Sequence, residues 1–237
     1  MKKKNRLLIS LLLIGLVLII TNSCMKDDAN KDDSLTFGTL TDIDGNIYKT
    51  ITIGNQTWMA ENLKTTKYSD GTLIGTTSPA SLDIFDENFP KYQWVYNGTE
   101  SNVSTYGRMY TWYALTSSCN ICPSDWHIPT DSEWESLIDY LGGYEVAGSK
   151  LKETGLTHWQ SPNEEVTNET GFTALPGGYR FYYGGFFDLG KYGIWWTSTE
   201  ASTIFARMHY MEASSGIVGW NIADKKIGYS VRCIRDY

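Results

Sequence analysis

The sequence predicts an α+β fold, because its one clear helix and its antiparallel strands occupy different parts of the chain. The helix is predicted at residues 131–141, where a Thr130-Asp131-Ser132-Glu133 capping box precedes apolar residues at helical spacing, namely Trp134, Leu137, Ile138 and Leu141. Gly142-Gly143 ends this helix. The C-terminal third alternates apolar runs with turn residues and predicts strands at 205–213, 217–223 and 227–234.

A hairpin is predicted at the start of the domain. Residues 40–43 and 47–51 flank Asp44-Gly45-Asn46, and Asp-Gly favours a tight hairpin turn. Asp42, Asp44 and Asn46 also resemble half of a calcium loop, but the remaining ligands, including the bidentate Glu at the twelfth position, are missing. The turn is therefore the favoured interpretation. The polar segment 67–103 predicts long surface loops.

Residues 1–23 predict a secretory signal peptide. A basic start is followed by an apolar run from Leu11 to Ile20 and by Thr21-Asn22-Ser23-Cys24. The run is short for a membrane-spanning helix, which needs about 20 apolar residues, so a retained membrane helix is the weaker alternative. The small residue before Cys24 resembles the lipobox of bacterial lipoproteins, with Thr21 in place of the usual Leu. This resemblance implies that Cys24 is acylated, and the alternative is cleavage that leaves a free Cys24.

Residues 24–37 predict a flexible acidic tether, and the folded domain is expected to cover residues 38–237. Met25-Lys26-Asp27-Asp28 resembles the export signal of Bacteroidetes surface lipoproteins. That resemblance implies an anchor in outer-membrane lipid through Cys24, with the domain exposed at the cell surface. Asp33-Ser34-Leu35 is similar to the O-glycosylation site of the same bacteria, which makes Ser34 a candidate modification site.

The charge of the chain argues against one class of partner. The full sequence has 20 basic and 27 acidic residues and a net charge of −7. Four of the basic residues belong to the signal peptide, so the mature chain has 16 basic against 27 acidic residues and a net charge of −11. An acidic protein repels phosphate backbones, so nucleic acid is not an expected partner.

Cysteines, histidines and motifs predict neither a metal site nor a cofactor. Cys119-x-x-Cys122 has no second pair at zinc spacing, and the histidines stand alone in the sequence, at His127, His158 and His209. His127 is predicted to be a packed core histidine. No nucleophile elbow, His-Glu-x-x-His motif or phosphate loop occurs, so no catalytic residue is assigned. A pair of glycosidase carboxylates stays open, because sequence spacing does not reveal it.

Six ordered blocks of sequence resemble the Fibrobacter succinogenes major paralogous domain, which is common on Bacteroidetes surface lipoproteins. They are residues 42–63, 106–112, 122–134, 171–178, 195–200 and 230–236. The resemblance covers about residues 38–237 and implies a C-type-lectin-like fold with mixed or antiparallel strands, one or two helices and long loops. This fold is distantly similar to formylglycine-generating enzymes, but the family implies no established activity. The resemblance also implies a disulfide between Cys122 and Cys233, with Cys119–Cys122 as the alternative pairing.

Aromatic density supplies the functional prediction. From Tyr179 to Trp196, nine of eighteen residues are Phe, Tyr or Trp, and some of these rings are expected at the surface, where flat rings suit sugars or a protein partner. The alternative is that the rings belong to the core, as a Trp195-Trp196 pair inside a family block suggests. The candidate ligand-binding residues are Tyr182, Phe186, Phe187 and Tyr192, with Trp159 as a second, weaker candidate.

The sequence therefore predicts a surface lipoprotein with a non-catalytic lectin-like module that binds a glycan or a cell-surface protein. The first alternative is a structural or adhesive surface protein without a discrete ligand site. The second is a hydrolase or oxidase whose active site the sequence does not reveal.

Overall fold

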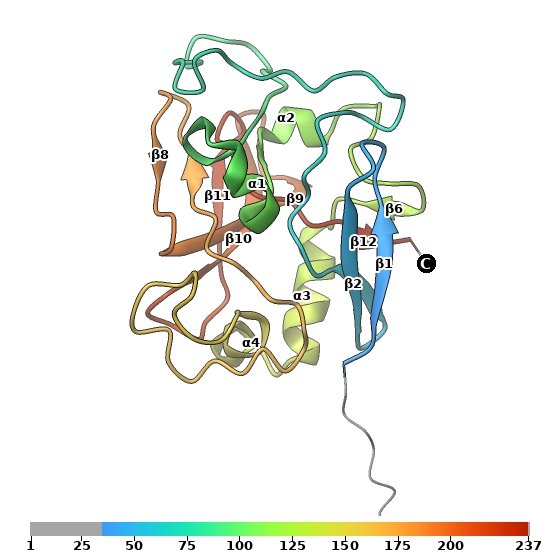
Figure 1. Cartoon of the computed structure of the whole chain (residues 1–237), viewed down its shortest axis with the longest axis vertical. Coiled ribbons are helices and arrows are strands. Elements are labelled where there is room, and N and C mark those ends of the chain that lie inside the picture. The colour runs from blue at the N-terminus through green and yellow to red at the C-terminus, as the bar shows by residue number, and fades with distance from the viewer. Residues whose placement is uncertain (1–34, 237) are drawn as a thin grey trace, which may run out of the picture. The chain divides into compact units, whose positions relative to one another are not determined.

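Two antiparallel sheets organise residues 35–236, which are the residues described in the computed structural model (Figure 1). The first sheet has the strand order β1-β2-β3-β12-β6, and its strands are β1 (Phe37–Thr41), β2 (Ile47–Ile53), β3 (Gln56–Met59), β12 (Ile234–Arg235) and β6 (Trp126–His127). The second sheet has the order β11-β10-β9, and its strands are β11 (Gly219–Asp224), β10 (Phe205–Glu212) and β9 (Tyr192–Glu200). Two short pairs complete the strands: β4 (Gln93–Trp94) with β5 (Met109–Tyr110), and β7 (Tyr179–Arg180) with β8 (Phe186–Phe187). The domain is therefore mixed α+β and mostly β, as the sequence predicted.

The helices cover little of the domain. Two span more than one turn, α3 (Asp131–Tyr140) and α4 (Tyr144–Leu151). The others are single turns, namely α1 (Val103–Tyr106), α2 (Trp112–Leu115) and the 3₁₀ turns Tyr96–Gly98 and Glu100–Asn102. No helix among residues 35–236 has the length and apolar character needed to cross a membrane.

The predicted helix at 131–141 is confirmed as α3, and so is its capping box. The Thr130 side chain accepts a hydrogen bond from the Glu133 N–H, and the Glu133 carboxylate accepts one from the Thr130 N–H at 2.7 Å. Its Trp134 side chain packs against Trp58 of β3 and stacks on His209 of β10, with ring centroids 5.1 Å apart in both pairs. Helix α3 therefore lies between the two sheets and joins their cores (Figure 1).

The predicted N-terminal hairpin is also confirmed, as β1 and β2 with Thr41 opposite Ile47. Asp42 holds its turn, because one carboxylate oxygen accepts the N–H groups of Asp44 and Asn46 at 3.0 and 2.9 Å. The Tyr48 hydroxyl donates to the other oxygen of Asp42. The carboxylate is thus occupied by turn contacts, in agreement with the turn interpretation.

The strand predicted at 227–234 is wrong over most of its length, since only its last residue, Ile234, belongs to a strand, β12. The segment instead makes single bridges to three different strands: Gly228 to Arg180, Tyr229 to Tyr110, and Ser230 to Trp195. Both of its faces are buried, and Arg232 is only 1% exposed. The segment therefore passes through the core between the small sheets rather than lying on one of them.

The segment 67–103 is irregular, as predicted, but it is not confined to the surface. Ile74, Ile84 and Trp94 within it are buried. The buried guanidinium of Arg180 lies 3.9 Å from the centre of the Trp94 ring. Part of this loop region therefore contributes to the core. The polar composition of the segment as a whole did not predict this.

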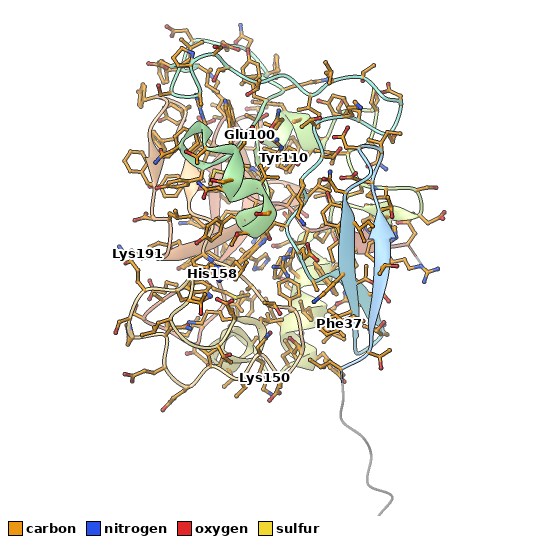
Figure 2. The ribbon with its side chains drawn as sticks, in the orientation of Figure 1. Phe37, Glu100, Tyr110, Lys150, His158 and Lys191 are labelled. Atoms are coloured by element: carbon orange, nitrogen blue, oxygen red, sulfur yellow. A yellow bond between two sulfur atoms is a disulfide. The ribbon has the colours of Figure 1, made fainter. Side chains whose placement is uncertain are left out.

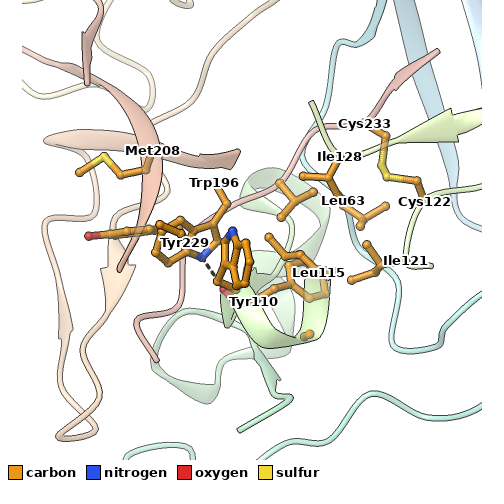
Figure 3. Packing of buried hydrophobic residues seen from close by; sticks show 14 of the residues in the cluster. Leu63, Tyr110, Leu115, Ile121, Cys122, Ile128, Trp196, Met208, Tyr229 and Cys233 are labelled. Atoms are coloured by element: carbon orange, nitrogen blue, oxygen red, sulfur yellow. Dashed lines mark hydrogen bonds between the residues drawn. A yellow bond between two sulfur atoms is a disulfide. The ribbon is translucent and has the colours of Figure 1, made fainter. Parts of the chain in front are cut away.

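The disulfide between Cys122 and Cys233 is present, and Cys119 is the free cysteine among residues 35–236. The alternative pairing of Cys119 with Cys122 is therefore wrong. One cluster of buried apolar residues includes Tyr110, Trp196 and Tyr229, and we call it the first hydrophobic cluster. The bond lies at the edge of this cluster, beside Ile121, Ile128 and Leu63 (Figure 3). It ties the segment before α3 to the C-terminal segment, 111 residues further along the chain. Cys24 and Ser34 lie outside the described residues.

Candidate functional site: a tyrosine groove on the second sheet

A groove of about 490 Å³ lies on the face of the second sheet that points away from α3. We call it the tyrosine groove, because four tyrosines line it together with acidic, basic and amide side chains. Its principal residues are Tyr179, Tyr192, Tyr210, Tyr229, Asp188, Lys191, Glu212 and Asn221.

Strand alternation builds this groove. Along β10, Met208, Tyr210 and Glu212 face the groove, whereas His209 and Met211 face α3 and the core. The strand register places Tyr192 of β9 opposite Glu212, and Gly219 of β11 opposite Tyr210. A Cβ atom at Gly219 would lie 2.2 Å from the Tyr210 ring, so this glycine gives the ring its place over β11.

Rings from outside the sheet close one side of the groove. Tyr229, in the buried C-terminal segment, lies 4.7 Å from the Trp196 ring and 6.0 Å from the Tyr179 ring, measured between centroids. Figure 3 shows Tyr229 beside Trp196, whose indole N–H donates to the Tyr110 carbonyl at 2.9 Å. The groove is therefore an aromatic surface supported from below by the core.

The polar groups of the groove are hydrogen-bonded in a fixed arrangement. The Tyr192 hydroxyl donates to one Glu212 carboxylate oxygen at 2.9 Å, and the Ser214 hydroxyl donates to the other at 3.0 Å. The hydrogen bond to Glu212, together with burial, raises the pKa of Tyr192 to about 12. The phenol is therefore neutral at physiological pH, while Lys191 lies exposed at the rim with its Nζ 5.2 Å from the Tyr192 ring centre (Figure 2).

A buried lysine anchors the turn that carries Glu212. Lys152, at the end of α4, is fully buried, and its Nζ donates to the carbonyls of Glu212 and Ser215 at 2.9 and 2.7 Å. Burial lowers the pKa of Lys152 to about 8. Both carbonyls belong to groove residues, so α4 fixes the position of the groove wall.

Among the predicted candidates, Tyr192 lies in the groove and Phe187 lies at its edge. The Phe187 side chain is 46% exposed, and its ring is 5.5 Å from that of the groove residue Tyr179. Sequence reasoning missed Tyr179, Tyr210 and Tyr229 as groove residues. Only their strand register and the path of the C-terminal segment bring them together, and neither is visible as a local pattern.

The other candidates lie elsewhere. Phe186 is half-buried and packs against Tyr96 on another side of the β7–β8 hairpin. Tyr182 is half-buried near the hairpin tip, where its ring is 5.6 Å from that of Phe85. The prediction of Trp159 as a surface ring is wrong: it is 1% exposed, and its indole N–H donates to the Ala174 carbonyl at 3.0 Å. A large apolar ring with a nearby backbone acceptor is stable in the core, where Lys152 also packs on its face.

The three histidines take different roles. The prediction of His127 as a core histidine is wrong, because its side chain is 37% exposed and both ring nitrogens contact carboxylates, those of Glu133 and Asp236. His209 is the core histidine and contacts Asp131. His158 contacts Glu153 through Nδ1 at 2.9 Å. Within residues 35–236, no three His, Cys, Asp or Glu side chains are grouped so that they could hold a metal ion.

The His127 ion pairs predict a pH dependence of stability. Burial alone would lower the pKa of His127, but the hydrogen bonds to Asp236 and Glu133 outweigh it and raise the pKa above 6.5. A raised pKa in the folded state contributes stability that is complete below about pH 6.5 and is lost as the pH rises through the raised value. The difference in unfolding free energy between the wild type and His127→Gln is therefore expected to shrink as the pH rises from about 6.5 through the raised pKa of His127. Urea titrations across this range measure it, and a difference that stays constant would contradict the ion pairs.

The fold and the groove define a small α+β domain, mostly β, with an aromatic groove on one sheet. The sequence model of the Fibrobacter succinogenes major domain matches residues 51–235. The chain belongs to this family, and the predicted resemblance is confirmed. No curated protein and no solved structure matches the chain.

Proposed function

We propose that this protein is a lipid-anchored cell-surface lipoprotein whose non-catalytic domain, of C-type-lectin-like fold, binds glycans in the tyrosine groove. The observation that carries the proposal is the combination of an open aromatic surface with fixed carboxylate, amide and phenol groups at its rim. Concave sites that combine aromatic and apolar side chains with oriented polar groups are typical of small-ligand binding.

The chemistry of the groove suits a neutral sugar. The Tyr192 and Tyr210 rings offer flat apolar faces to the C–H face of a pyranose, and Asp188, Glu212 and Asn221 offer acceptors and a donor for its hydroxyls. Two carboxylates and an acidic chain disfavour anionic polysaccharides, since like charges repel.

The cell-surface part of the proposal rests on the sequence. Three features of the sequence support it: the signal-peptide pattern of residues 1–23, the resemblance of the segment around Cys24 to a lipobox, and the resemblance of the residues after Cys24 to an acidic export signal. In support of the lectin-like fold, the domain has long loops, small antiparallel sheets and the Cys122–Cys233 disulfide that the resemblance implied.

Replacement of Tyr210 by Ala is expected to weaken glycan binding about tenfold, because one stacking surface worth about 1.4 kcal/mol is lost. Titration calorimetry measures this with neutral oligosaccharides that bind the wild type in an array. Tyr140→Ala is the matched control, since Tyr140 is a 66% exposed tyrosine on α3, beyond the opposite face of the sheet. Equal affinities of both variants, or no glycan binding by the wild type, would contradict the proposal.

Two alternatives have distinct outcomes in the same assays. Binding to a cell-surface protein and to no glycan would favour an adhesive role.

Turnover of a polysaccharide would favour a hydrolase, for which the His158–Glu153 pair is the strongest candidate. Glu153 accepts the Nδ1 proton of His158, which leaves the Nε2 lone pair for a pocket that Ser104 and Thr105 also line. Loss of that turnover in His158→Gln would assign it to this pair.

A further inference from the structure

Three aromatic rings form a second exposed surface near the tip of the β7–β8 hairpin. Phe85 and Tyr183 are 48% and 53% exposed, and their rings are stacked, with centroids 5.2 Å apart and planes 22° apart. Tyr182 packs beside both rings, at 5.6 Å from Phe85 and 4.6 Å from Tyr183. We call these three residues the aromatic platform. Exposed large rings in contact with one another are typical of interaction sites.

A buried arginine fixes the two segments that carry the platform. Arg180 is fully buried and donates from Nε to the Ala80 carbonyl at 3.0 Å, from Nη1 to the Phe181 carbonyl at 3.2 Å, and from Nη2 to the Leu82 carbonyl. It thereby connects the loop before Phe85 with the hairpin that carries Tyr182 and Tyr183. No carboxylate forms an ion pair with it within residues 35–236, so its charge is satisfied by the backbone of the platform segments.

Two further contacts hold the platform rings in place. The Ile84 N–H donates to the Tyr182 carbonyl at 2.9 Å, and the Lys226 ammonium donates to the Phe85 carbonyl. Gly184 has φ +94°, and a Cβ atom there would lie 1.9 Å from the Ser81 carbonyl oxygen, so the hairpin tip meets the loop at a distance that only glycine permits. The backbone segments that carry the rings are therefore held together before any ligand arrives, which lowers the entropic cost of binding.

The platform and the groove share one hairpin. Tyr179 lines the groove at the start of β7, and Tyr183 follows four residues later. Since a strand rises about 3.3 Å per residue, their Cα atoms are no more than about 13 Å apart. A chain of linked sugar rings that leaves the groove along the hairpin would meet the platform next.

We propose that the aromatic platform of Phe85, Tyr182 and Tyr183 is a second glycan subsite, which stacks on a neutral pyranose of the same polysaccharide that occupies the tyrosine groove. This inference rests on the proposed function. The Asp83 carboxylate next to the platform, which accepts the Phe85 N–H at 2.8 Å, offers further acceptor capacity for sugar hydroxyls and disfavours anionic glycans. Two linked subsites make long chains bind more tightly than short ones without any change in the groove.

The test compares short and long ligands on the mature soluble domain. The probes are neutral cello-, xylo-, manno- and malto-oligosaccharides of two and of eight sugars, titrated calorimetrically. In the series that binds, the Phe85→Ala/Tyr183→Ala variant is expected to bind the octasaccharide about tenfold more weakly and the disaccharide as tightly as the wild type. The control Phe89→Ala removes a 67% exposed ring from the same loop region and is expected to change neither affinity.

A second variant separates the loss of stacking from a folding defect. Phe85→Leu/Tyr183→Leu keeps apolar bulk but removes the flat rings, and it is expected to show the same loss for the octasaccharide with an unchanged melting temperature. If the wild type binds the disaccharide and neither double variant alters octasaccharide binding, the second subsite is overturned and the groove stands. If the wild type binds none of the probes, the proposed function fails and the subsite with it.

Discussion

Replacement of Arg232 by Met is expected to lower the free energy of unfolding by about 4 kcal/mol or more, because it leaves several carbonyl groups unpaired in the core. The side chain is 1% exposed. Its Nε donates to Asn62 Oδ1 at 2.9 Å, Nη2 donates to the Thr173 carbonyl at 2.9 Å, and Nη1 donates to the Phe172 carbonyl. The guanidinium carbon also lies 4.2 Å from the centre of the Phe172 ring.

The size of the effect follows from the number of acceptors that lose a donor. An unsatisfied buried polar group costs about 1–3 kcal/mol, and the carbonyls of both Phe172 and Thr173 depend on this guanidinium. Burial lowers the pKa of Arg232 to about 9, so the group is still charged at neutral pH, and the backbone dipoles around it stabilise that charge. A loss of about 4 kcal/mol is a large part of the 5–15 kcal/mol that typically stabilises a domain.

Urea denaturation followed by tryptophan fluorescence measures this loss. Arg235→Met is the matched control, because Arg235 lies three residues further on and is exposed. Arg232→Lys is expected to fall between the two, since an ammonium has three donors but lacks the planar fork that reaches separate carbonyls. A midpoint of Arg232→Met equal to that of Arg235→Met would contradict the role of the guanidinium.

Local signals in the sequence predicted the local elements correctly. The capping box at Thr130 defined the start of α3, and Asp44-Gly45 defined the turn of the β1–β2 hairpin. Helix α4 was missed because the residue before it, Gly143, offers no capping side chain and because Gly148 interrupts its pattern. Gly148 is needed there for packing, since a Cβ atom would lie 2.5 Å from the Gly216 carbonyl oxygen. Tertiary packing thus requires a residue of low helix propensity at position 148, so the sequence pattern did not reveal the helix.

The C-terminal segment shows why period-two alternation was misleading. Ile227, Tyr229 and Val231 do alternate and are buried, but so are Ser230 and Arg232 between them. Alternation predicts one buried and one exposed face, whereas three separate bridges enclose this segment on all sides. Arg232 donates only to backbone carbonyls and to the Asn62 amide oxygen, so no acidic residue in the sequence marks it as a buried residue with partners.

The candidate site was predictable only in part, because contacts between distant segments bring its residues together and such contacts leave no local pattern in the sequence. Aromatic density pointed to the segment that contains Tyr192 and Phe187, which lie in or beside the groove. Tyr210 and Phe85 come from other segments with ordinary composition. Only strand register brings Tyr210 to the groove, and only the contacts of Arg180 bring Phe85 to the aromatic platform. Trp159 belongs to the core, where the Lys152 ammonium lies over its ring and the Ala174 carbonyl accepts its indole N–H.

Removal of the Cys122–Cys233 disulfide is expected to destabilise the domain by about 4–5 kcal/mol. The bond closes a loop of 111 residues, and the chain-entropy model gives about 4.7 kcal/mol for a loop of about 100 residues. Both cysteines are buried in the first hydrophobic cluster, so the reduced form gains no compensating hydration in the folded state. At about 2–4 °C for each kcal/mol in a domain of this size, the melting temperature falls by about 8–20 °C.

Calorimetry of Cys122→Ala/Cys233→Ala measures this effect, and Cys119→Ala is the control because Cys119 is the free cysteine. Wild type and Cys119→Ala are expected to melt together, and a reductant should lower both towards the double variant while leaving the double variant unchanged. A double variant that melts with the wild type would contradict the bond. In the unfolded chain the bond keeps Cys233, near the end of the core segment 227–234, close to the segment before α3. Loss of the bond is therefore expected to slow refolding as well as to lower the melting temperature, because the closure of a long loop then has to precede the core contacts.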